Sequence, residues 1–596
     1  MAAVLLVFAA GCATLPPPSE PSVEVKADVR EKVQRPPVPA DHRAYYHFMR
    51  GYQLEVEHRY AESLSEYLAA LTYQPESRDL LLSAARLYLR NGDLEGAIET
   101  AETVLGYYPS DPDVLNLLSS LYLQERDVDR AGEVFRQLIA LDPGDVKPYY
   151  LMTMAYLREG RFDDARGVLA EARAIDRKSP LPDYYAGRIY KAEGNSRKAL
   201  AAFKKAMGKD RLFEASYLDS AALYESQGRA DKAIRMYEKV VREINPRSFV
   251  AREALIQLYL QEGNLEKVLV HIDGGLEAVP RNPNMLYRKA TLLAELNRFD
   301  EAIDAAAAAL AFTPSNIRTL MLLGSLYLRT QNDPDARRTF HRVLELDPDY
   351  YQAHINLGYI ANRAGDQESL EREVEAVGRM MEKLPEEIEL YLFVGWGHMK
   401  MKRFEEAAAT LERAATVDPG NTSVHFSLGT VYYELKRHED VVREMRAVIK
   451  EDPRHAGALN FLGYSYAERG ERLDEAVELV KRALKEEPDN GYFLDSLSWS
   501  YYMQGRYREA LKIQRQAIEK SPEKDPVLFE HLGSILLALE KPVEAREAWV
   551  KALTLQPDNE ALAELFRDAG FGDPEVIGQI VAPGETIPGV PTITSP

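Results

Sequence analysis

The sequence predicts an all-α protein built from stacked helix pairs. Fourteen prolines recur at an almost constant step, and most neighbours lie 34 or 35 residues apart. A small residue, a tyrosine and an alanine recur 10, 13 and 22 residues after these prolines. A period of this size indicates structural repeats that are each too small to bury an apolar face alone. The prolines are Pro75, Pro109, Pro143, Pro180, Pro246, Pro280, Pro314, Pro348, Pro385, Pro419, Pro453, Pro488, Pro522 and Pro557.

Each recurring residue type has a physical role in such a repeat. A small residue such as Gly324 lets one helix approach its neighbour closely, and an aromatic residue such as Tyr327 fills space between successive pairs. Turn dipeptides such as Asn91-Gly92 permit the left-handed conformation that ends a helix. A proline that follows Asp, as in Asp142-Pro143, ends the second helix and opens the next repeat.

This combination of small residue, tyrosine, alanine and terminal proline resembles the tetratricopeptide repeat over roughly residues 44–559. The resemblance implies about 15 helix-turn-helix units that wind into a right-handed superhelical solenoid with a concave groove. The first unit runs from Tyr45 to Pro75, and residues 560–570 form a capping helix that shields the last apolar face.

Two intervals of 37 residues, before Pro180 and before Pro385, each insert three residues between units. They predict either a local change of pitch or a longer loop that the repeats tolerate. We divide the array accordingly into an N-terminal part, residues 44–384, and a C-terminal part, residues 385–559. Any hinge between them falls near Met381–Glu387.

The N-terminus resembles a targeting signal and does not show the repeat pattern. An apolar run from Ala2 to Ala10 is signal-sized and too short to span a bilayer. The segment Ala9-Ala10-Gly11-Cys12 resembles a bacterial lipoprotein signal, which implies that residues 1–12 form the signal and that Cys12 is lipidated. Ala13 then implies an outer-membrane protein that faces the periplasm. The alternatives are an ordinary cleaved signal, or a misassigned start and a cytoplasmic protein.

Two further segments lie outside the repeats. Residues 13–43 are rich in proline and poor in apolar residues, so we expect an extended tether. Residues 571–596 contain Gly and Pro and are expected to form a flexible tail.

The sequence gives no support to catalysis. The 11 histidines show no metal-ligand spacing on a helical turn, and neither a His-Glu-x-x-His run nor a phosphate-binding Gly-Lys loop occurs. The single cysteine, Cys12, belongs to the signal. A formal net charge of -20 disfavours nonspecific binding to nucleic acid. We therefore expect no enzyme activity, no cofactor and no metal.

A binding surface is predicted in the last third of the array, where positions that face the groove turn aromatic. Flat rings supply contact area, and amide or carboxylate groups hold a peptide backbone or a sugar hydroxyl. Alternatively, the rings pack between adjacent first helices. The residues are Trp396, Phe426, Tyr433, Asn460, Tyr464, Asp495, Trp499, Tyr502 and His531.

Together these features predict a scaffold or adaptor that binds an extended peptide or a partner protein in its groove. By fold analogy the setting is the assembly of a secretion, pilus or exopolysaccharide machine. One alternative is a groove for an exported polysaccharide or a peptidoglycan strand. Another is a cytoplasmic regulator, which would apply if Cys12 is never processed.

Overall fold

In the computed structural model, residues 42–521 and 525–572 are described. The predicted all-α repeat architecture is confirmed: 31 α-helices follow one another in this part of the chain, and no strand interrupts them. Helices α1 to α30 form 15 successive pairs, which agrees with the predicted number of repeats, and α31 follows the last pair. The predicted right-handed winding stays a prediction. The signal, Cys12 and tether assignments and the predicted tail also stay predictions, because residues 1–41 and 573–596 lie outside the described residues.

The chain divides into two compact units, between Leu258 and Tyr259. The first contains α1(His42–Val56), α2(Tyr60–Leu71), α3(Arg78–Arg90), α4(Leu94–Tyr107), α5(Pro112–Glu125), α6(Val128–Leu141), α7(Lys147–Arg158), α8(Phe162–Ile175), α9(Leu181–Ala192), α10(Ser196–Lys209), α11(Glu214–Ser226), α12(Ala230–Lys239) and a π-helical turn, η1(Val240–Ile244). Helix α13(Phe249–Gln261) crosses the division.

The second unit contains α14(Leu265–Ala278), α15(Pro283–Glu295), α16(Phe299–Phe312), α17(Ile317–Arg329), α18(Asp333–Leu346), α19(Tyr351–Arg363), α20(Gln367–Met380), α21(Ile388–Lys400), α22(Phe404–Val417), α23(Thr422–Glu434), α24(His438–Glu451), α25(Ala456–Glu468), α26(Leu473–Glu486), α27(Gly491–Met503), α28(Tyr507–Lys520), α29(Pro526–Ala538), α30(Pro542–Leu555) and α31(Glu560–Asp568).

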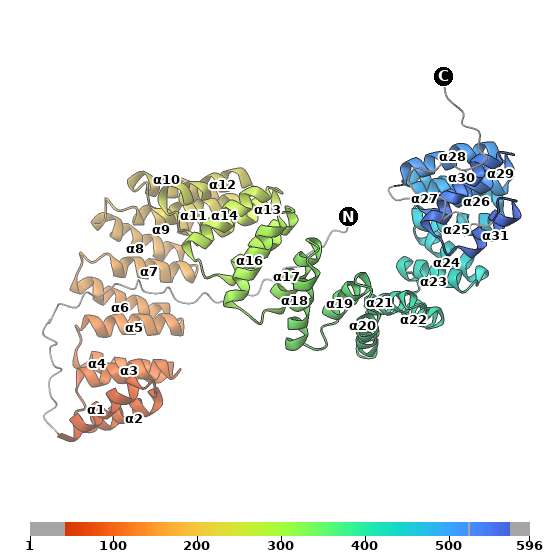
Figure 1. The fold of residues 1–596 in the computed structure, drawn as a ribbon. Coiled ribbons are helices and arrows are strands. Elements are labelled where there is room, and N and C mark those ends of the chain that lie inside the picture. Colours follow the sequence, from red (N-terminus) through yellow and green to blue (C-terminus); the bar gives the residue numbers. More distant parts are fainter. Residues whose placement is uncertain (1–41, 522–524, 573–596) are drawn as a thin grey trace. The chain divides into compact units, whose positions relative to one another are not determined.

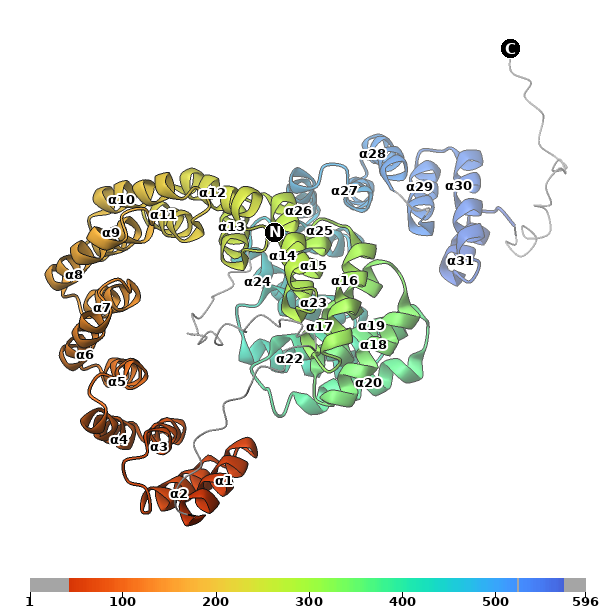
Figure 2. The ribbon, with the colours of Figure 1, turned by 90° about the vertical axis from the view of Figure 1, so that its left-hand side faces the viewer.

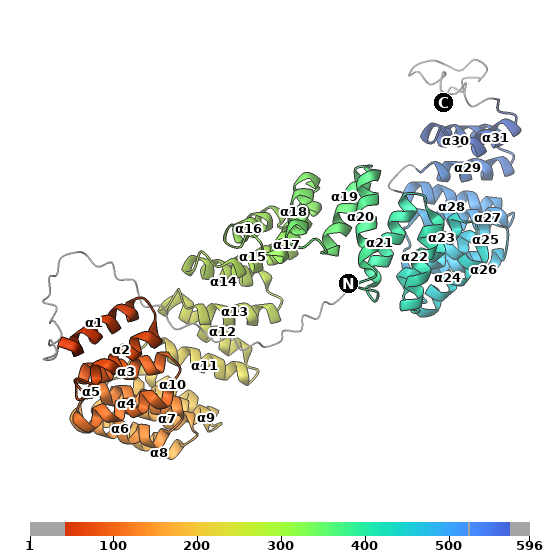
Figure 3. The ribbon, with the colours of Figure 1, turned by 90° about the horizontal axis from the view of Figure 1, so that it is seen from below.

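Within each unit the pairs stack in chain order. In the first unit, α5 to α8 lie in successive layers (Figure 1). The same unit forms a curved row in which α9 and α11 lie on the inner side and α10 on the outer side (Figure 2). In the second unit, α28, α29 and α30 again form successive layers (Figure 3). In this part of the first unit the first helix of each pair therefore lines the inner side of the row, as the repeat pattern predicts.

The division at Leu258 differs from the boundary that we predicted after residue 384. Helices α20 and α21, on either side of that predicted boundary, belong to the same unit. The three inserted residues extend the end of α20, where Met380 and Met381 are buried and the Leu384 amide donates to the Met380 carbonyl at 2.9 Å. Because the insertion is absorbed in a packed turn, the hydrophobic core continues through it.

The two helices of a pair touch where the first helix carries its small residue. Gly324 of α17 lies under the ring of Phe340 of α18, so closely that a Cβ on Gly324 would lie 2.5 Å from a ring carbon. Gly533 of α29 has the same relation to Trp549 of α30, with 2.3 Å to the indole ring. In both pairs the partner lies 16 residues further along the chain. The small residue is therefore required by the close approach of two helices.

The turn inside each pair requires a residue with positive φ. In the predicted turn dipeptides this residue is glycine, as at Gly92 (φ 82°) and Gly505 (φ 74°). Asn297 and Lys402 adopt the same conformation at the equivalent place, with φ 58° each. The turn geometry is thus kept even where the glycine of the pattern is absent.

The recurring proline ends one repeat, and its carbonyl forms a hydrogen bond with the first helix of the next repeat. The Tyr391 hydroxyl donates to the Pro385 carbonyl at 3.1 Å, six residues back. A ring nitrogen of His425 lies 2.9 Å from the Pro419 carbonyl, while its Nδ1 lies 2.6 Å from Glu444 on the second helix. This position therefore links the end of one repeat to both helices of the following one.

We predict that Gly324→Ala lowers the free energy of unfolding by about 1–3 kcal/mol, because the added methyl group overpacks the contact with Phe340. Gly167, in the middle of α8, is exposed and has open space around it. Gly167→Ala should therefore raise stability by about 0.5–1 kcal/mol through helix propensity alone. Chemical denaturation followed by circular dichroism measures both changes. A Gly324→Ala protein as stable as the wild type would contradict the close-contact interpretation.

Candidate functional site

The nine residues predicted to line a groove all lie on first helices of their pairs, from α21 to α29. None of them is fully open to solvent. Asp495 and His531 are only 6% and 5% exposed, and the other seven are half-buried. The prediction that they bind a partner is not tested by this arrangement, and their contacts show what each side chain does in the free protein.

Most of the predicted rings contact other rings of the array. Trp396 lies edge-on to Tyr359, with 4.6 Å between ring centroids. Phe461, on the next first helix, lies 6.2 Å from Phe426 and 5.4 Å from Tyr433. These contacts correspond to the alternative in which aromatic rings pack between adjacent first helices.

Two tyrosines of the strip sit in environments that favour the neutral phenol. The Tyr433 hydroxyl donates to the Glu468 carboxylate at 2.9 and 3.0 Å. Burial and this hydrogen bond raise the pKa of Tyr433. Burial likewise raises the pKa of Tyr464. Neither hydroxyl is therefore available as a base near neutral pH.

Asp495 joins three helices through a buried polar network. Its carboxylate accepts from Gln514 Nε2 of α28 at 2.6 Å and lies 2.9 Å from His531 Nδ1 of α29. Gln514 also donates to the Leu528 carbonyl at 2.8 Å. The His531 ring stacks on Trp499 with 4.1 Å between centroids. The structure thus brings Asp495, Trp499 and His531 together, as a link between two repeats.

Gln514 was not predicted as part of this cluster. It lies on a second helix, 19 residues after Asp495, and its side chain is fully buried. The sequence signal for such a residue is a polar side chain at a position of the second helix that packs against the first helix. Two other repeats place Glu373 and Glu444 19 residues after a histidine of the first helix, with similar contacts.

A hollow in the first unit has the features of a binding groove. It has a volume of about 680 Å³ and is lined from four consecutive first helices, α5, α7, α9 and α11. Leu123, Leu151, Met154 and Leu157 make its apolar part, and Leu151 is 39% exposed. An open apolar surface across several repeats is where an extended ligand buries side chains.

The rim of this hollow is basic. Arg158, Arg188 and Lys191 line it together with Asp219. Lys191 Nζ lies 2.6 Å from Asp219, which also accepts a hydrogen bond from the Tyr184 hydroxyl at 2.9 Å. Arg188 donates only to the sulfur of Met154, at 3.2 Å, and Arg158 has no ion pair among the described residues. Two guanidinium groups therefore face the hollow without a carboxylate partner.

This hollow was not predicted from the sequence, which indicated a binding surface only in the last third of the array. Leucines at Leu123, Leu151 and Leu157 read as core positions in a repeat, because apolar residues recur there for packing. What distinguishes them is their combination with basic residues one repeat further on, at Arg188 and Lys191.

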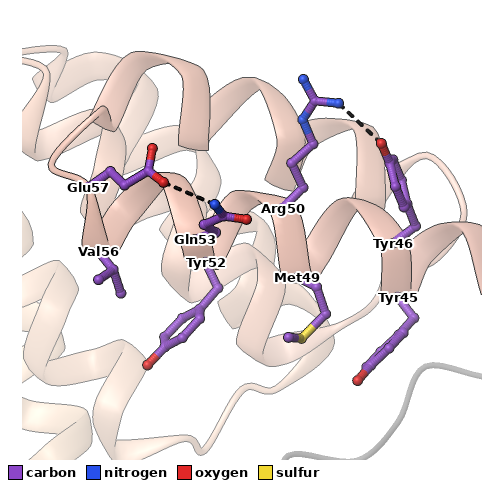
Figure 4. Close-up of a pocket in the computed structure, with 8 residues that line it drawn as sticks. All are labelled: Tyr45, Tyr46, Met49, Arg50, Tyr52, Gln53, Val56 and Glu57. Carbon is purple, nitrogen blue, oxygen red and sulfur yellow. Dashed lines mark hydrogen bonds between the residues drawn. The ribbon is translucent and has the colours of Figure 1, made fainter.

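A second hollow lies along α1 and marks the open edge of the array. Figure 4 shows Tyr45, Met49, Tyr52 and Val56 pointing to the same side of α1, and the hollow beside them measures about 800 Å³. Their exposed fractions range from 40% for Tyr45 to 62% for Val56. In the following repeats, the equivalent side of the first helix packs against the preceding pair. Here no preceding pair exists among the described residues.

The described residues contain no cluster of three or more His, Cys, Asp or Glu placed to hold a metal ion. Within the same residues, no helix is both long and apolar enough to cross a membrane.

Comparison with protein families agrees with the repeat pattern. Three family profiles, each described as "Tetratricopeptide repeat", together match more than half of the chain. The chain is a tetratricopeptide repeat protein. The matches cover residues 48–112, 82–146, 122–186, 215–248, 293–357, 398–463, 442–491, 469–526 and 496–560. Repeats of this family form protein-interaction scaffolds, and the family is generally non-enzymatic.

Individual relatives match only parts of this tetratricopeptide repeat chain. A TPR repeat-containing protein of Pseudomonas aeruginosa is 27% identical over 209 residues, which is 34% of this chain and 34% of that protein. The Type IV pilus assembly protein PilF of the same organism is 25% identical over 189 residues, 31% of this chain and 61% of that protein. The chain thus spans less than two thirds of either relative.

Among solved structures, the crystal structure of the APC/C hetero-tetramer Cut9-Hcn1 aligns with 80% of this chain and 98% of its own, at 15% identity and a TM-score of 0.35. A tetratricopeptide repeat protein of Parabacteroides merdae aligns with 42% of this chain, at 17% identity and a TM-score of 0.33.

We predict that Asp495→Ala lowers the free energy of unfolding by about 2–4 kcal/mol, because it leaves the buried His531 without its partner and removes one of the two acceptors of Gln514. Asp489→Ala serves as a matched control, since Asp489 is exposed and pairs only with Lys520 at the surface. That control should change stability by less than about 1 kcal/mol. Urea denaturation measures both variants, and equal effects would contradict a structural role for the tetratricopeptide array's buried network.

Proposed function

We propose that this protein is a scaffold that binds an extended segment of a partner protein in the hollow lined by α5, α7, α9 and α11. The observation that carries this proposal is the combination, in one place, of an exposed leucine-lined surface with two guanidinium groups that lack carboxylate partners. A hollow that spans several repeats suits an extended chain better than a small molecule, because it offers successive contacts along one direction.

The chemistry of the hollow specifies the kind of segment. An apolar side chain of the partner packs on Leu151 and Leu157, and a neighbouring carboxylate pairs with Arg158 or Arg188. Arginine is suited to this task because its planar guanidinium binds a carboxylate through two parallel hydrogen bonds. The favoured ligand is therefore a peptide with an apolar residue close to an acidic residue or to its C-terminal carboxylate.

The proposed setting is the cell envelope. The sequence Ala9-Ala10-Gly11-Cys12 supports lipidation of Cys12, and Ala13 supports placement at the outer membrane, facing the periplasm. The similarity of part of the chain to a protein named for type IV pilus assembly supports a role in assembling an envelope machine. A secretion or exopolysaccharide machine is an equivalent setting for a scaffold of this kind.

A carbohydrate-binding groove is the second candidate, and the aromatic strip of the second unit is its basis. Sugar recognition uses ring faces that are open to the ligand. In the strip, Trp499 stacks on both His531 and Tyr502, with centroids 4.1 and 4.6 Å apart. The rings are thus engaged with one another, which favours the peptide-binding proposal over the carbohydrate one.

To test the groove, a photo-crosslinking amino acid is placed at Leu151 in cells that produce the full chain. We expect a discrete adduct with one partner, whose crosslinked peptide carries an acidic residue near an apolar one. Arg188→Glu should reduce the yield of this adduct by about tenfold or more, because it replaces an attractive charge with a repulsive one. Mass spectrometry of the adduct identifies the partner and the contacting segment.

The matched control places the same crosslinker at Leu141, which is 46% exposed at the end of α6 and does not line the hollow. The proposal is wrong if Leu141 and Leu151 give the same adducts, or if the Leu151 adduct is insensitive to Arg188→Glu.

For the lipid anchor, we predict that Cys12→Ala moves the protein from the membrane fraction to the soluble fraction and abolishes incorporation of labelled fatty acid. Membranes are washed at high salt so that only an anchored protein is retained. Ala13→Ser keeps the cysteine and should stay in the membrane fraction. A Cys12→Ala protein that remains membrane-bound after the wash would exclude the anchor, and a wild type that is soluble would favour the cytoplasmic alternative.

A further inference from the structure

One stretch of the first unit has a charge opposite to that of the chain. Residues 173–211, from the end of α8 to the loop after α10, contain eleven Lys and Arg against four Asp and Glu, while the whole chain has a net charge of -20. The net charge of the whole chain conceals this basic stretch. This part of the surface therefore has a local excess of seven positive charges.

The four acidic residues of this stretch are already engaged. Asp183 pairs with Arg173 and with Lys209, each at 2.9 Å. Asp176 accepts from the Tyr150 hydroxyl at 2.8 Å, and Glu193 pairs with Arg166. Asp210 accepts from the backbone amide of Leu212 at 2.9 Å. None of them neutralises the remaining basic groups.

Apart from Lys198, whose ammonium group lies over the Tyr190 ring, six exposed basic side chains are left without an ion pair among the described residues: Arg177, Lys178, Arg197, Lys204, Lys205 and Arg211. We call them the α10 surface. Elsewhere in the array many exposed arginines are paired with carboxylates, as Arg403 is with Glu371 and Arg506 with Glu509, while others, such as Arg281 and Arg508, have no ion pair among the described residues. What distinguishes the α10 surface is that six such cations are gathered in one stretch that has seven more basic than acidic residues.

These six residues share one region. Lys204 and Lys205 follow Arg197 by two helical turns, which puts them on the same side of α10. Lys209, at the end of α10, donates to the Ser179 carbonyl at 3.1 Å, and this bond brings the loop with Arg177 and Lys178 beside the loop with Arg211. Helix α10 lies on the outer side of the row (Figure 2), opposite to the side lined by α9 and α11.

An apolar residue stands within the same surface. Leu212, next to Arg211, is 65% exposed. In most other repeats the residue that follows the end of the second helix by three positions is small or polar, as at Gly144 and Asp349. An exposed leucine beside basic side chains is suited to the boundary between lipid headgroups and acyl chains.

We propose that the α10 surface binds the anionic headgroups of a phospholipid bilayer, with Leu212 entering the interface. Clusters of this size are attracted to negatively charged bilayers by each Lys or Arg near the surface. Three of the six cations are lysines, and two of these lie side by side on α10. Lysine acts as a mobile point charge suited to a diffuse anionic surface.

The test uses the chain from Ala13 to Pro596, which contains every described residue and carries no lipid. It is sedimented with vesicles of phosphatidylcholine alone or with 30 mol% phosphatidylglycerol. We expect binding only to the phosphatidylglycerol vesicles, falling steeply as salt is raised because exposed charges are screened. Because this chain lacks Cys12, the outcome does not depend on the proposed anchor, and the peptide groove is on the other side of the row.

The decisive variant is Lys204→Glu with Lys205→Glu, which should weaken binding to phosphatidylglycerol vesicles by more than about tenfold. Lys481→Glu with Lys485→Glu on α26 is the matched control, since it makes the same change in net charge on another exposed second helix. That control should bind like the wild type. Leu212→Ser should lower the binding that persists at high salt. Circular dichroism and the denaturation midpoint establish that each variant is folded.

The proposal is overturned if pure phosphatidylcholine vesicles bind equally well, or if the two charge-reversed variants lose binding equally. A further arm offers immobilised poly-glutamate as a mimic of an acidic protein. If the wild type binds poly-glutamate through Lys204 and Lys205 but does not bind phosphatidylglycerol vesicles, the α10 surface recognises an acidic protein and the lipid proposal is wrong.

Discussion

The packing on which the rest of the array depends joins the two helices of a single repeat. A small residue of the first helix accepts a large side chain of the second, 16 residues later, as in Gly324 with Phe340 and Gly533 with Trp549. The contact sets the distance between the helices, since a Cβ there would collide with the ring. It also buries the aromatic residue within the pair, so the other sides of both helices remain available to stack on the next pair. A repeat is too small to bury its apolar surface alone, so this stacking completes the core.

Stacking then requires that each repeat begin at a fixed place, and the proline with its carbonyl provides this. Residues six positions after the proline return a hydrogen bond to its carbonyl, from tyrosine at Tyr391 and from histidine at His354 and His425. The chemistry of the donor varies while the geometry is kept. The same tolerance is seen in the turns, where Asn297 or Lys402 replaces the glycine at positive φ. At the close helix contact the first helix keeps a small residue, while its partner varies from Phe340 and Trp549 to Leu411 and Met445.

These constraints explain how far the sequence could predict the structure. Helix pairs, their number and their turns follow from residues that repeat, because every unit solves the same packing problem. The surroundings of the aromatic strip do not follow, since they depend on pairs of residues in different repeats. Phe461 lies between Phe426 and Tyr433 of the preceding first helix, and Asp495 meets His531 36 residues later. A single unit read by itself shows none of these partners, so a ring with a neighbour and a ring open to solvent have the same sequence pattern.

Many surface arginines form ion pairs that follow the repeat, and some cations without an ion pair are candidates for binding a partner. Arginines commonly pair with acidic residues about one repeat away, as Arg136 does with Glu171 at 2.6 Å and Arg454 with Glu486 at 2.6 Å. Each such pair contributes little to stability by itself, but it uses a cation of one repeat to neutralise the next. Among the described residues, Arg158 and Arg188 on the inner side of the first unit and the six residues of the α10 surface on its outer side have no ion pair. Because the two groups lie on opposite sides of the same row, occupation of one leaves the other accessible. A scaffold with this arrangement can rest on an anionic surface through α10 and still present its groove to a partner.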